Sequence, residues 1–168
     1  MLDDRAVKVH GNLHKKCLSV VPRKKPYKTQ HFFNGVLMLT DCEFRVSEKA
    51  HERIQQTNVR EVCARVWGIK QNWEPIESID EINARFTYPE FVRVSYNPKE
   101  FGTRPYFYTA VLGDRIDSYP LCYLVNHPEI DSPTNCHCYI HNTLQTLTDR
   151  TQAVESFLLW GSDRQLRQ

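Results

Sequence analysis

The chain has 168 residues, of which 40% are hydrophobic and 25% charged, and its net charge is +2. This length and composition predict one folded domain with its own core and exclude an intrinsically disordered chain. No apolar run is long enough for a transmembrane helix, and the N-terminus lacks the zones of a signal peptide. We therefore expect a cytoplasmic protein whose six dispersed cysteines are free thiols.

Charge is distributed unevenly along the chain. Residues 1–70 contain 14 Lys and Arg against 7 Asp and Glu, whereas residues 71–168 contain 8 against 13. The basic excess peaks in one segment that holds no acid: Lys15, Lys16, Arg23, Lys24, Lys25 and Lys28. Such a run favours an anionic partner, although a solvated surface explains it equally well.

Alternating and apolar segments predict a mainly antiparallel β-rich body. We expect strands at residues 6–10, 17–21, 35–46, 60–69, 91–96, 106–112 and 119–125. In the third segment, Cys42 and Phe44 should face the core while Asp41, Glu43 and Arg45 face outward. A dimer or larger homo-oligomer is also expected, because a sheet of this kind leaves edges to cover.

Helices are expected at three places. Ser47 stands where an N-cap belongs and predicts a short helix over residues 47–56, and a second short helix is expected around 78–84. Val154, Phe157 and Leu158 share a helical face and Gly161 follows them, which predicts a C-terminal helix over 148–160. The predicted class is therefore α+β, in a single domain (1–168) that ends in a helical tail (142–168).

An internal repeat is suggested by two short segments. V-K-V-H-G-N at residues 7–12 resembles V-R-V-S-Y-N at residues 92–97, at an offset of 85. If this match is not due to chance, the chain consists of two similar halves, 5–70 and 90–130. Each segment would then be a strand that ends in an asparagine turn.

The stretch V-H-G-N-L-H-K-K-C at residues 9–17 is the first candidate site. Asparagine suits a tight turn, and histidine and lysine can donate hydrogen bonds to phosphate oxygens. A turn on a rigid sheet often binds a ligand, but more often it is merely solvated. The candidate ligand-binding residues here, in the basic run and in the second segment are Asn12, His14, Lys15, Lys16, Arg23, Lys24, Lys25, Tyr96, Asn97 and Lys99.

Other candidate sites have weaker support. Cys136, Cys138 and His141 are possible zinc ligands, but one residue separates the cysteines where structural zinc sites favour two to four. A strand with alternating, partly buried thiols is the better interpretation of this segment. Cys17 beside His14 is a possible nucleophile, although a half-buried structural cysteine is the better interpretation. No nucleotide-binding glycine motif or paired-carboxylate cluster is present, so we nominate no catalytic residue, metal or cofactor.

Four segments resemble a family of small uncharacterised proteins from bacterial and phage genomes. They are N-L-H-K-K-C-L-S-V, L-T-D-C-E-F-R-V-S-E-K-A-H-E-R, V-C-A-R-V-W-G and V-S-Y-N-P, within residues 7–110. The family has no established activity, so the resemblance implies phage or mobile-element origin and a bacterial host but no chemistry. The family pattern N-V-H-A reads E-V-C-A here, at Glu61–Ala64, so this chain lacks that histidine.

Together these features favour a non-catalytic protein that binds a phosphorylated ligand, either a nucleotide signal or a nucleic acid, on a basic surface. A phage protein of this kind would act against host defence, and a host protein is an alternative partner. No membrane partner is expected. Two other classes stay open: a small hydrolase or nuclease that uses His14 or His141, and a structural or assembly protein of the phage particle.

Overall fold

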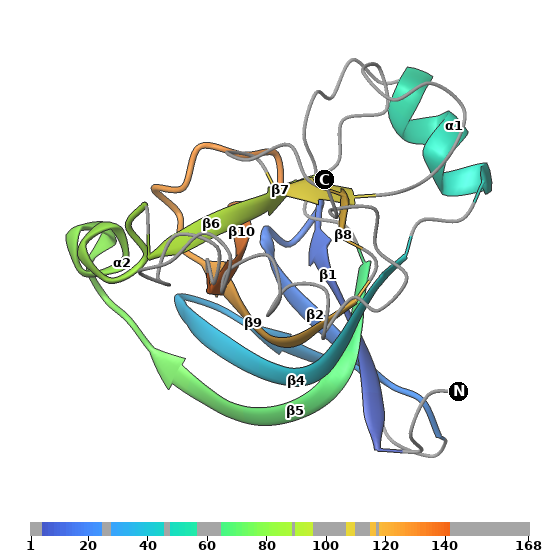
Figure 1. Ribbon diagram of the computed structural model, residues 1–168, viewed down its shortest axis with the longest axis horizontal. Coiled ribbons are helices and arrows are strands. Elements are labelled where there is room, and N and C mark those ends of the chain that lie inside the picture. The colour runs from blue at the N-terminus through green and yellow to red at the C-terminus, as the bar shows by residue number, and fades with distance from the viewer. Residues whose placement is uncertain are drawn as a thin grey trace, which may run out of the picture.

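The computed structural model describes residues 5–24, 28–45, 48–56, 65–88, 90–95, 107–109, 115–116 and 118–141. Within these ranges the chain forms ten strands and two helices (Figure 1). The strands are β1 (Ala6–Asn12), β2 (Cys17–Pro22), β3 (Gln30–Phe32), β4 (Gly35–Arg45), β5 (Arg65–Pro75), β6 (Phe91–Ser95), β7 (Phe107–Thr109), β8 (Arg115–Ile116), β9 (Ser118–Asn126) and β10 (Cys136–His141), and the helices are α1 (Glu48–Gln56) and α2 (Ile79–Arg85). In this described part of the chain, neither helix has the length and apolar character to cross a membrane.

All ten strands belong to one antiparallel sheet, in the order β3-β2-β1-β5-β4-β9-β10-β6-β7-β8. The long strands β4 and β5 curve strongly across the molecule (Figure 1). Their pairing shifts register between Met38 and Leu39 and again between Thr40 and Glu43. Asp41, inside the second shift, has a left-handed φ of 54°. Because bulges bend a strand and increase its twist, these two positions let the sheet curl.

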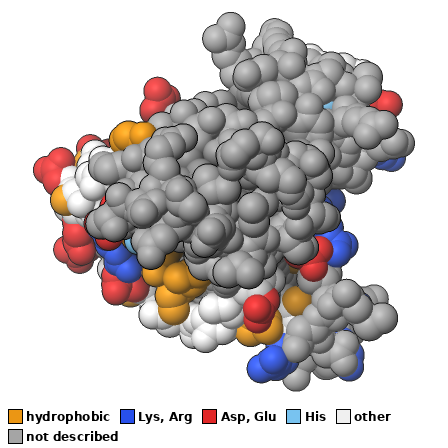
Figure 2. All heavy atoms as spheres, in the orientation of Figure 1, with side chains coloured by type: hydrophobic (Ala, Val, Ile, Leu, Met, Phe, Trp, Pro, Cys, Tyr) orange, Lys and Arg blue, Asp and Glu red, His pale blue; other side chains and the backbone are white. Residues whose placement is uncertain are grey.

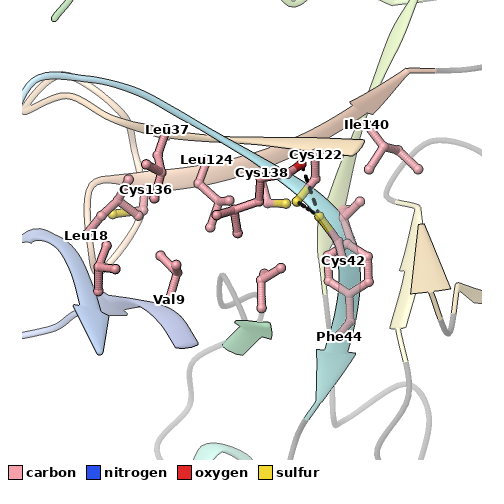
Figure 3. Packing of buried hydrophobic residues seen from close by; sticks show 14 of the residues in the cluster. Val9, Leu18, Leu37, Cys42, Phe44, Cys122, Leu124, Cys136, Cys138 and Ile140 are labelled. Atoms are coloured by element: carbon pink, nitrogen blue, oxygen red, sulfur yellow. Dashed lines mark hydrogen bonds between the residues drawn. The ribbon is translucent and has the colours of Figure 1, made fainter. Parts of the chain in front are cut away.

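The curled sheet encloses an apolar core on one face, which we call the inner face. Figure 3 shows Val9 and Leu18 of the first hairpin lying opposite Leu124 and Cys136 across this core. The full cluster draws buried side chains from seven strands: Val9, Leu18, Val20, Leu37, Leu39, Cys42, Phe44, Val66, Val92, Val94, Cys122, Leu124, Cys136, Cys138 and Ile140. Since each fully buried aliphatic side chain contributes about 1.5–3 kcal/mol, this cluster is a main source of stability.

A smaller apolar cluster lies on the opposite, outer face, where α2 packs over β4, β9 and β10. The Oγ atom of Ser78 caps this helix by accepting a hydrogen bond from the N–H of Asp80 (3.1 Å). Phe86, just after the helix, stacks on Tyr139 with ring centroids 4.8 Å apart and an interplanar angle of 12°. The buried members of the cluster are Val36, Ile76, Ile82, Phe86, Val125 and Ile130. In this way α2 covers the outer face of the second half of the sheet.

The second half of the sheet repeats the strand order of the first. β3-β2-β1-β5-β4 is followed by β9-β10-β6-β7-β8, which is the same arrangement in reverse, so β6 corresponds to β1 and β10 to β5. The register also agrees, since three facing pairs of β1 and β5 have counterparts in β6 and β10. The pairs Val7–Gly68, Lys8–Trp67 and Val9–Val66 correspond to Val92–Ile140, Arg93–Tyr139 and Val94–Cys138. The two-half organisation stays a prediction, which this common register at the offset of 85 supports.

The expected α+β class is wrong. The described residues form a mainly antiparallel β protein in which the helices have only nine and seven residues. Two stretches outside the seven strand ranges given above account for part of the difference. The segment C-H-C-Y-I-H alternates buried and half-buried residues as β10, and the polar residues 70–75 extend β5 along β4. No helix follows β9 within the described residues, and the expected helix over 148–160 and tail over 142–168 lie outside them.

Several strand predictions are confirmed. Strands occur at the expected places in β1, β2, β4, β6 and β9, and α2 occupies the region expected around 78–84. Cys42 and Phe44 are buried whereas Asp41 and Arg45 are exposed, as the alternation predicts. The five described cysteines are free and buried, which confirms the thiol prediction for them. The single-domain organisation over the whole chain stays a prediction.

Candidate functional site

The turn between β1 and β2 is organised by Asn12. Its Oδ1 accepts hydrogen bonds from the N–H groups of His14 (3.0 Å) and Lys15 (2.8 Å). Its backbone carbonyl accepts one from the N–H of Lys16 (2.8 Å), whose φ is 54°. Asparagine suits this position because its side chain can bond to backbone groups two or three residues later. These three N–H groups are therefore used within the turn, and any anion contact here depends on the exposed side chains of His14, Lys15 and Lys16.

A chain of hydrogen bonds runs from this turn across β2 to β3. Nδ2 of Asn12 donates to Oγ of Ser19 (3.0 Å), and Oγ of Ser19 lies 3.0 Å from Nδ1 of His31. Because Ser19 is 1% exposed, its hydroxyl proton needs an acceptor, and Nδ1 of His31 is the one that the described contacts provide. This assigns the neutral His31 ring the tautomer with hydrogen on Nε2. The exposed ring of His31 then carries an N–H donor for a ligand.

His10 lies beside this chain, directly opposite Ser19 on the neighbouring strand. Its Nδ1 is buried and has no hydrogen-bond partner among the described residues. Burial lowers the pKa of His10, and the positive charges of Lys8 and Arg65 and the nearby ring of His31 lower it further. The same charges favour an anion at this place.

Trp67 continues the outer face across β5. It faces Lys8 on β1 and Glu43 on β4 in the strand register. Nζ of Lys8 and Cζ of Arg45 lie 6.0 Å and 5.7 Å from the ring centroid of Trp67, within cation–π range. Arg45 also forms an ion pair with Glu43 (2.8 Å). A half-buried aromatic ring thus lies beside two cations on the outer face of the sheet.

We call this surface the basic face. It comprises the outer face of β3-β2-β1-β5-β4 and carries Lys8, His10, His31, Arg45, Arg65 and Trp67. Figure 2 shows Lys and Arg side chains on the side of the molecule where β1 and β2 lie, whereas acidic side chains gather around α2. In this view the acidic side chains are concentrated around α2, although single side chains of the opposite charge occur on both sides.

The predicted ligand-binding residues do not form one patch. Lys15 and Lys16 precede β2, whereas Arg23 and Lys24 follow it, so the length of this six-residue strand separates them. At about 3.3 Å per residue, that distance is on the order of 17 Å. Arg23 and Lys24 lie at the Lys8 end of the hairpin, because Lys8 faces Val21. The remaining candidates Lys25, Tyr96, Asn97 and Lys99 lie outside the described residues.

Cys17 does not have the environment of a nucleophile. The nearest described imidazole nitrogen is Nδ1 of His31, at 3.8 Å, and not His14 as we had considered. The side chain of Cys17 is fully buried. Burial raises the pKa of its thiol by more than the hydrogen bond to Ser19 and the charge of Lys15 lower it. Cys17 is therefore a protonated structural thiol beneath the basic face.

The three weak zinc candidates are not brought together. Cys136 and Cys138 point into the core, whereas His141 lies on the opposite face of β10 and its ring contacts Phe91 edge-on. Side chains on opposite faces of one strand cannot share a tetrahedral site. Within the described ranges, no cluster of three His, Cys, Asp or Glu side chains is placed to hold a metal ion.

The sequence interpretation missed most of the basic face. None of Lys8, His31, Arg65 and Trp67 was among the predicted ligand-binding residues. The available signal was the alternation in β1 and β5, which puts Lys8 and His10 on one face and Arg65 and Trp67 on one face. That these faces coincide depends on the pairing of β1 with β5, which no local pattern reveals.

Comparisons with known proteins point to a phage. A family model described as the Mycobacterium phage L5 gene 82 protein matches residues 1–130, so the chain belongs to this phage-encoded family. This confirms the resemblance to a family of small phage proteins. That the N-L-H-K and Y-N-P motifs are characteristic of this family stays a prediction. No curated protein and no solved structure matches the chain.

Proposed function

We propose that this member of the Mycobacterium phage L5 gene 82 family is a non-catalytic binding protein that takes a phosphorylated ligand on its basic face. The ligand would be a nucleotide signal or a nucleic acid, in the cytoplasm of a bacterial host. Capture of a nucleotide signal would act against host defence. The observation that carries the proposal is the juxtaposition of Lys8, Trp67 and Arg45 beside two histidines on adjacent strands.

Electrostatics supports an anionic ligand. The positive charges of Lys8 and Arg65 contribute to the lowered pKa of His10, so their potential reaches the buried Nδ1 of that ring. A neutral imidazole can still donate or accept a hydrogen bond, and Lys and Arg supply the charge that phosphate requires. The exposed N–H that the tautomer assignment gives His31 adds a directed donor.

Burial of the potential nucleophiles supports binding over catalysis. Ser19 is 1% exposed and Cys17 is fully buried, although both lie close to His31. A substrate on the basic face would meet the exposed imidazole and the cations before either nucleophile. The geometry is that of a supported binding surface, in which Asn12 and Ser19 orient His31.

The proposal is tested by fluorescence anisotropy with labelled single-stranded and double-stranded oligonucleotides, and by thermal shift with mono-, di- and cyclic nucleotides. We expect binding that weakens as salt rises, because phosphate neutralisation releases counterions. With an oligonucleotide, Lys8→Ala should lower affinity and reduce the salt slope by about 1.

Lys70→Ala is the matched control. Lys70 is on the same strand as Trp67 and its Nζ lies 4.9 Å from the ring centroid of Phe32, so it makes a similar contact on the other face of the sheet. The proposal predicts unchanged affinity for this variant. An equal loss in Lys8→Ala and Lys70→Ala, or no binding of any phosphorylated probe at low salt, would contradict it.

A further inference from the structure

We infer that Trp67 is a stacking platform for a nucleobase, with Lys8 and Arg45 placed to receive the phosphate attached to that base. This inference rests on the proposed function and narrows its ligand from phosphorylated molecules in general to nucleotides. A free nucleotide and a single-stranded nucleic acid share this chemistry, and the experiment below separates them.

The first argument is the correspondence between the two halves of the sheet. Lys8 faces Trp67 across β1 and β5, and Arg93 faces Tyr139 across β6 and β10. The flanking pairs correspond as well, so the two cation–aromatic pairs occupy the same position in each half. What contacts Tyr139 in the second half therefore indicates what kind of group Trp67 is placed to accept in the first.

In the second half this position is filled by the chain itself. Phe86, which follows α2, lies almost parallel to Tyr139 at a centroid distance of 4.8 Å. Arg85 lies beside Phe86 and the neighbouring ring of Tyr123, with Cζ 5.2 Å from the centroid of Phe86 and 6.0 Å from that of Tyr123. The outer face of this half thus holds a planar aromatic group in a stack with a guanidinium next to it.

In the first half, no described aromatic side chain stacks on Trp67, which corresponds to Tyr139. Trp67 is half-buried, and within the described ranges the charged groups beside its ring are Lys8 and Arg45. A planar group that carries negative charge would complete the stack and pair with Lys8 and, beside the existing ion pair with Glu43, with Arg45. A nucleobase with its phosphate has both properties, and base–aromatic stacking tolerates any base sequence. An acidic peptide would satisfy the charge but not the stack.

The test measures the affinity of the full chain by isothermal titration calorimetry for three probes: ribose 5-phosphate, a nucleoside 5′-monophosphate and a short single-stranded oligonucleotide. We expect the monophosphate to bind more tightly than ribose 5-phosphate. Trp67→Leu should weaken the monophosphate by about tenfold and leave ribose 5-phosphate unchanged. Trp67→Tyr should restore most of the affinity, because it restores a π-face. A far larger gain for the oligonucleotide than for the monophosphate would identify a nucleic acid as the source of the base.

The outcomes separate this inference from the proposed function. If Lys8→Ala weakens all three probes but Trp67→Leu weakens none, the basic face binds phosphate without stacking and the inference is wrong. The same conclusion follows if Trp67→Leu weakens ribose 5-phosphate as much as the monophosphate. If the wild-type chain binds no probe, both proposals fail. Thermal denaturation of each variant establishes that it is folded, and Trp67→Tyr provides the test should Trp67→Leu not fold.

Discussion

Asn126 donates a hydrogen bond from Nδ2 to the backbone carbonyl of Lys16, although 110 residues separate them in the chain (2.9 Å). The same side chain donates to the carbonyl of Asn135 (3.1 Å) and accepts from the N–H of Asn34 (2.9 Å). Lys16, Asn34 and Asn135 all have left-handed φ values, of 54°, 57° and 57°. One buried amide therefore joins three strained turns that end the β1–β2, β3–β4 and β9–β10 connections. This contact holds the first hairpin, and with it the basic face, against the second half of the sheet.

Asn126→Ala should be strongly destabilising. The substitution removes three hydrogen bonds at a residue that is 1% exposed. The N–H of Asn34 and the carbonyl of Lys16 lose this partner, whereas the carbonyl of Asn135 keeps the hydrogen bond from the N–H of His127. We expect a loss of about 2–4 kcal/mol in the free energy of unfolding, measured by urea denaturation. Asn72→Ala, at an exposed asparagine of β5, is the control and should change stability little. Equal stability of the two variants would show that Asn126 does not join the turns.

The stability of the protein should depend on His137 in mildly acidic solution. Burial, and after it the charge of Arg93, lower the pKa of His137 to about 4 against the opposing charge of Asp131. Nη1 of Arg93 lies 3.3 Å from Nε2 of His137 and donates to it, and Nδ1 of His137 lies 3.1 Å from the hydroxyl of Tyr139. A proton on Nε2 would therefore face a guanidinium.

The pKa of His137 is lower in the folded than in the unfolded chain, so protonation of this residue favours unfolding. Between about pH 6.5 and pH 4 the unfolded chain binds a proton at residue 137 that the folded chain does not, so stability falls as pH falls. Above about pH 6.5 the folded protein is more stable by on the order of 3 kcal/mol than it is below about pH 4, as far as His137 alone is concerned. His137→Gln should flatten the unfolding free energy over this range, whereas His14→Gln, in an exposed turn, should not. Parallel pH profiles for the wild type and His137→Gln would contradict this assignment.

The β-strands were more predictable than the sheet. Alternation located β1 and β4 because each has one face on the core. The helix expected around 78–84 is α2, and the structure shows that Ser78 caps it. We did not predict the C-terminal part of β5, because its residues 70–72 are polar and exposed, although this part of the strand pairs with β4. The segment of β10 was interpreted as a strand with alternating thiols in preference to a zinc site, and its cysteines do pack in the core. Both segments are strands because they pair with neighbouring strands of the sheet, β5 with β4 and β10 with β9 and β6.

The candidate site was predicted only in part for the same reason. The turn at Asn12 was recognised from local chemistry, and the structure shows which atoms make it. The contact between Ser19 and His31 depends on the register of β2 with β3. Because β3 has only three residues, no periodic pattern in the sequence predicts it. The proximity of Lys8, Trp67 and Arg45 requires three strands from distant parts of the sequence. The sequence alone suggested a different basic site, made of the lysines that lie close together in the chain at residues 15–28.

Asn12→Ala should lower stability in the absence of any ligand. It removes the acceptor for the N–H groups of His14 and Lys15 and the donor to Ser19, at an expected cost of about 1–2 kcal/mol. Asn12→Asp keeps the acceptors and should cost less. Thermal denaturation measures both, and unchanged stability of Asn12→Ala would contradict the structural role. Ligand affinities of Asn12 variants should be compared only where both are folded.

The five described cysteines should resist alkylation in the folded protein. Cys17, Cys42, Cys122, Cys136 and Cys138 are each at most 2% exposed. Burial, followed by hydrogen bonds from Cys138 and Cys42, raises the pKa of Cys122 well above its ordinary value, and its Sγ lies 2.9 Å from that of Cys42. Burial also raises the pKa of Cys136 to about 11. Peptide mass spectrometry after iodoacetamide treatment at pH 8 should find these thiols labelled only when denaturant is present. Rapid labelling of Cys42 or Cys122 without denaturant would contradict this core.

The central claim is that a phosphorylated ligand binds on the basic face at Trp67. The most direct measurement is a ¹H–¹⁵N correlation spectrum of the tryptophan indole groups during titration with a nucleoside monophosphate, with the Trp67 signal assigned from Trp67→Phe. The account predicts a saturable shift of the Trp67 indole signal and no shift for Trp73, whose ring packs against Phe32 at 4.9 Å. An unmoved Trp67 signal at saturating nucleotide, or an equal shift of Trp73, would contradict it.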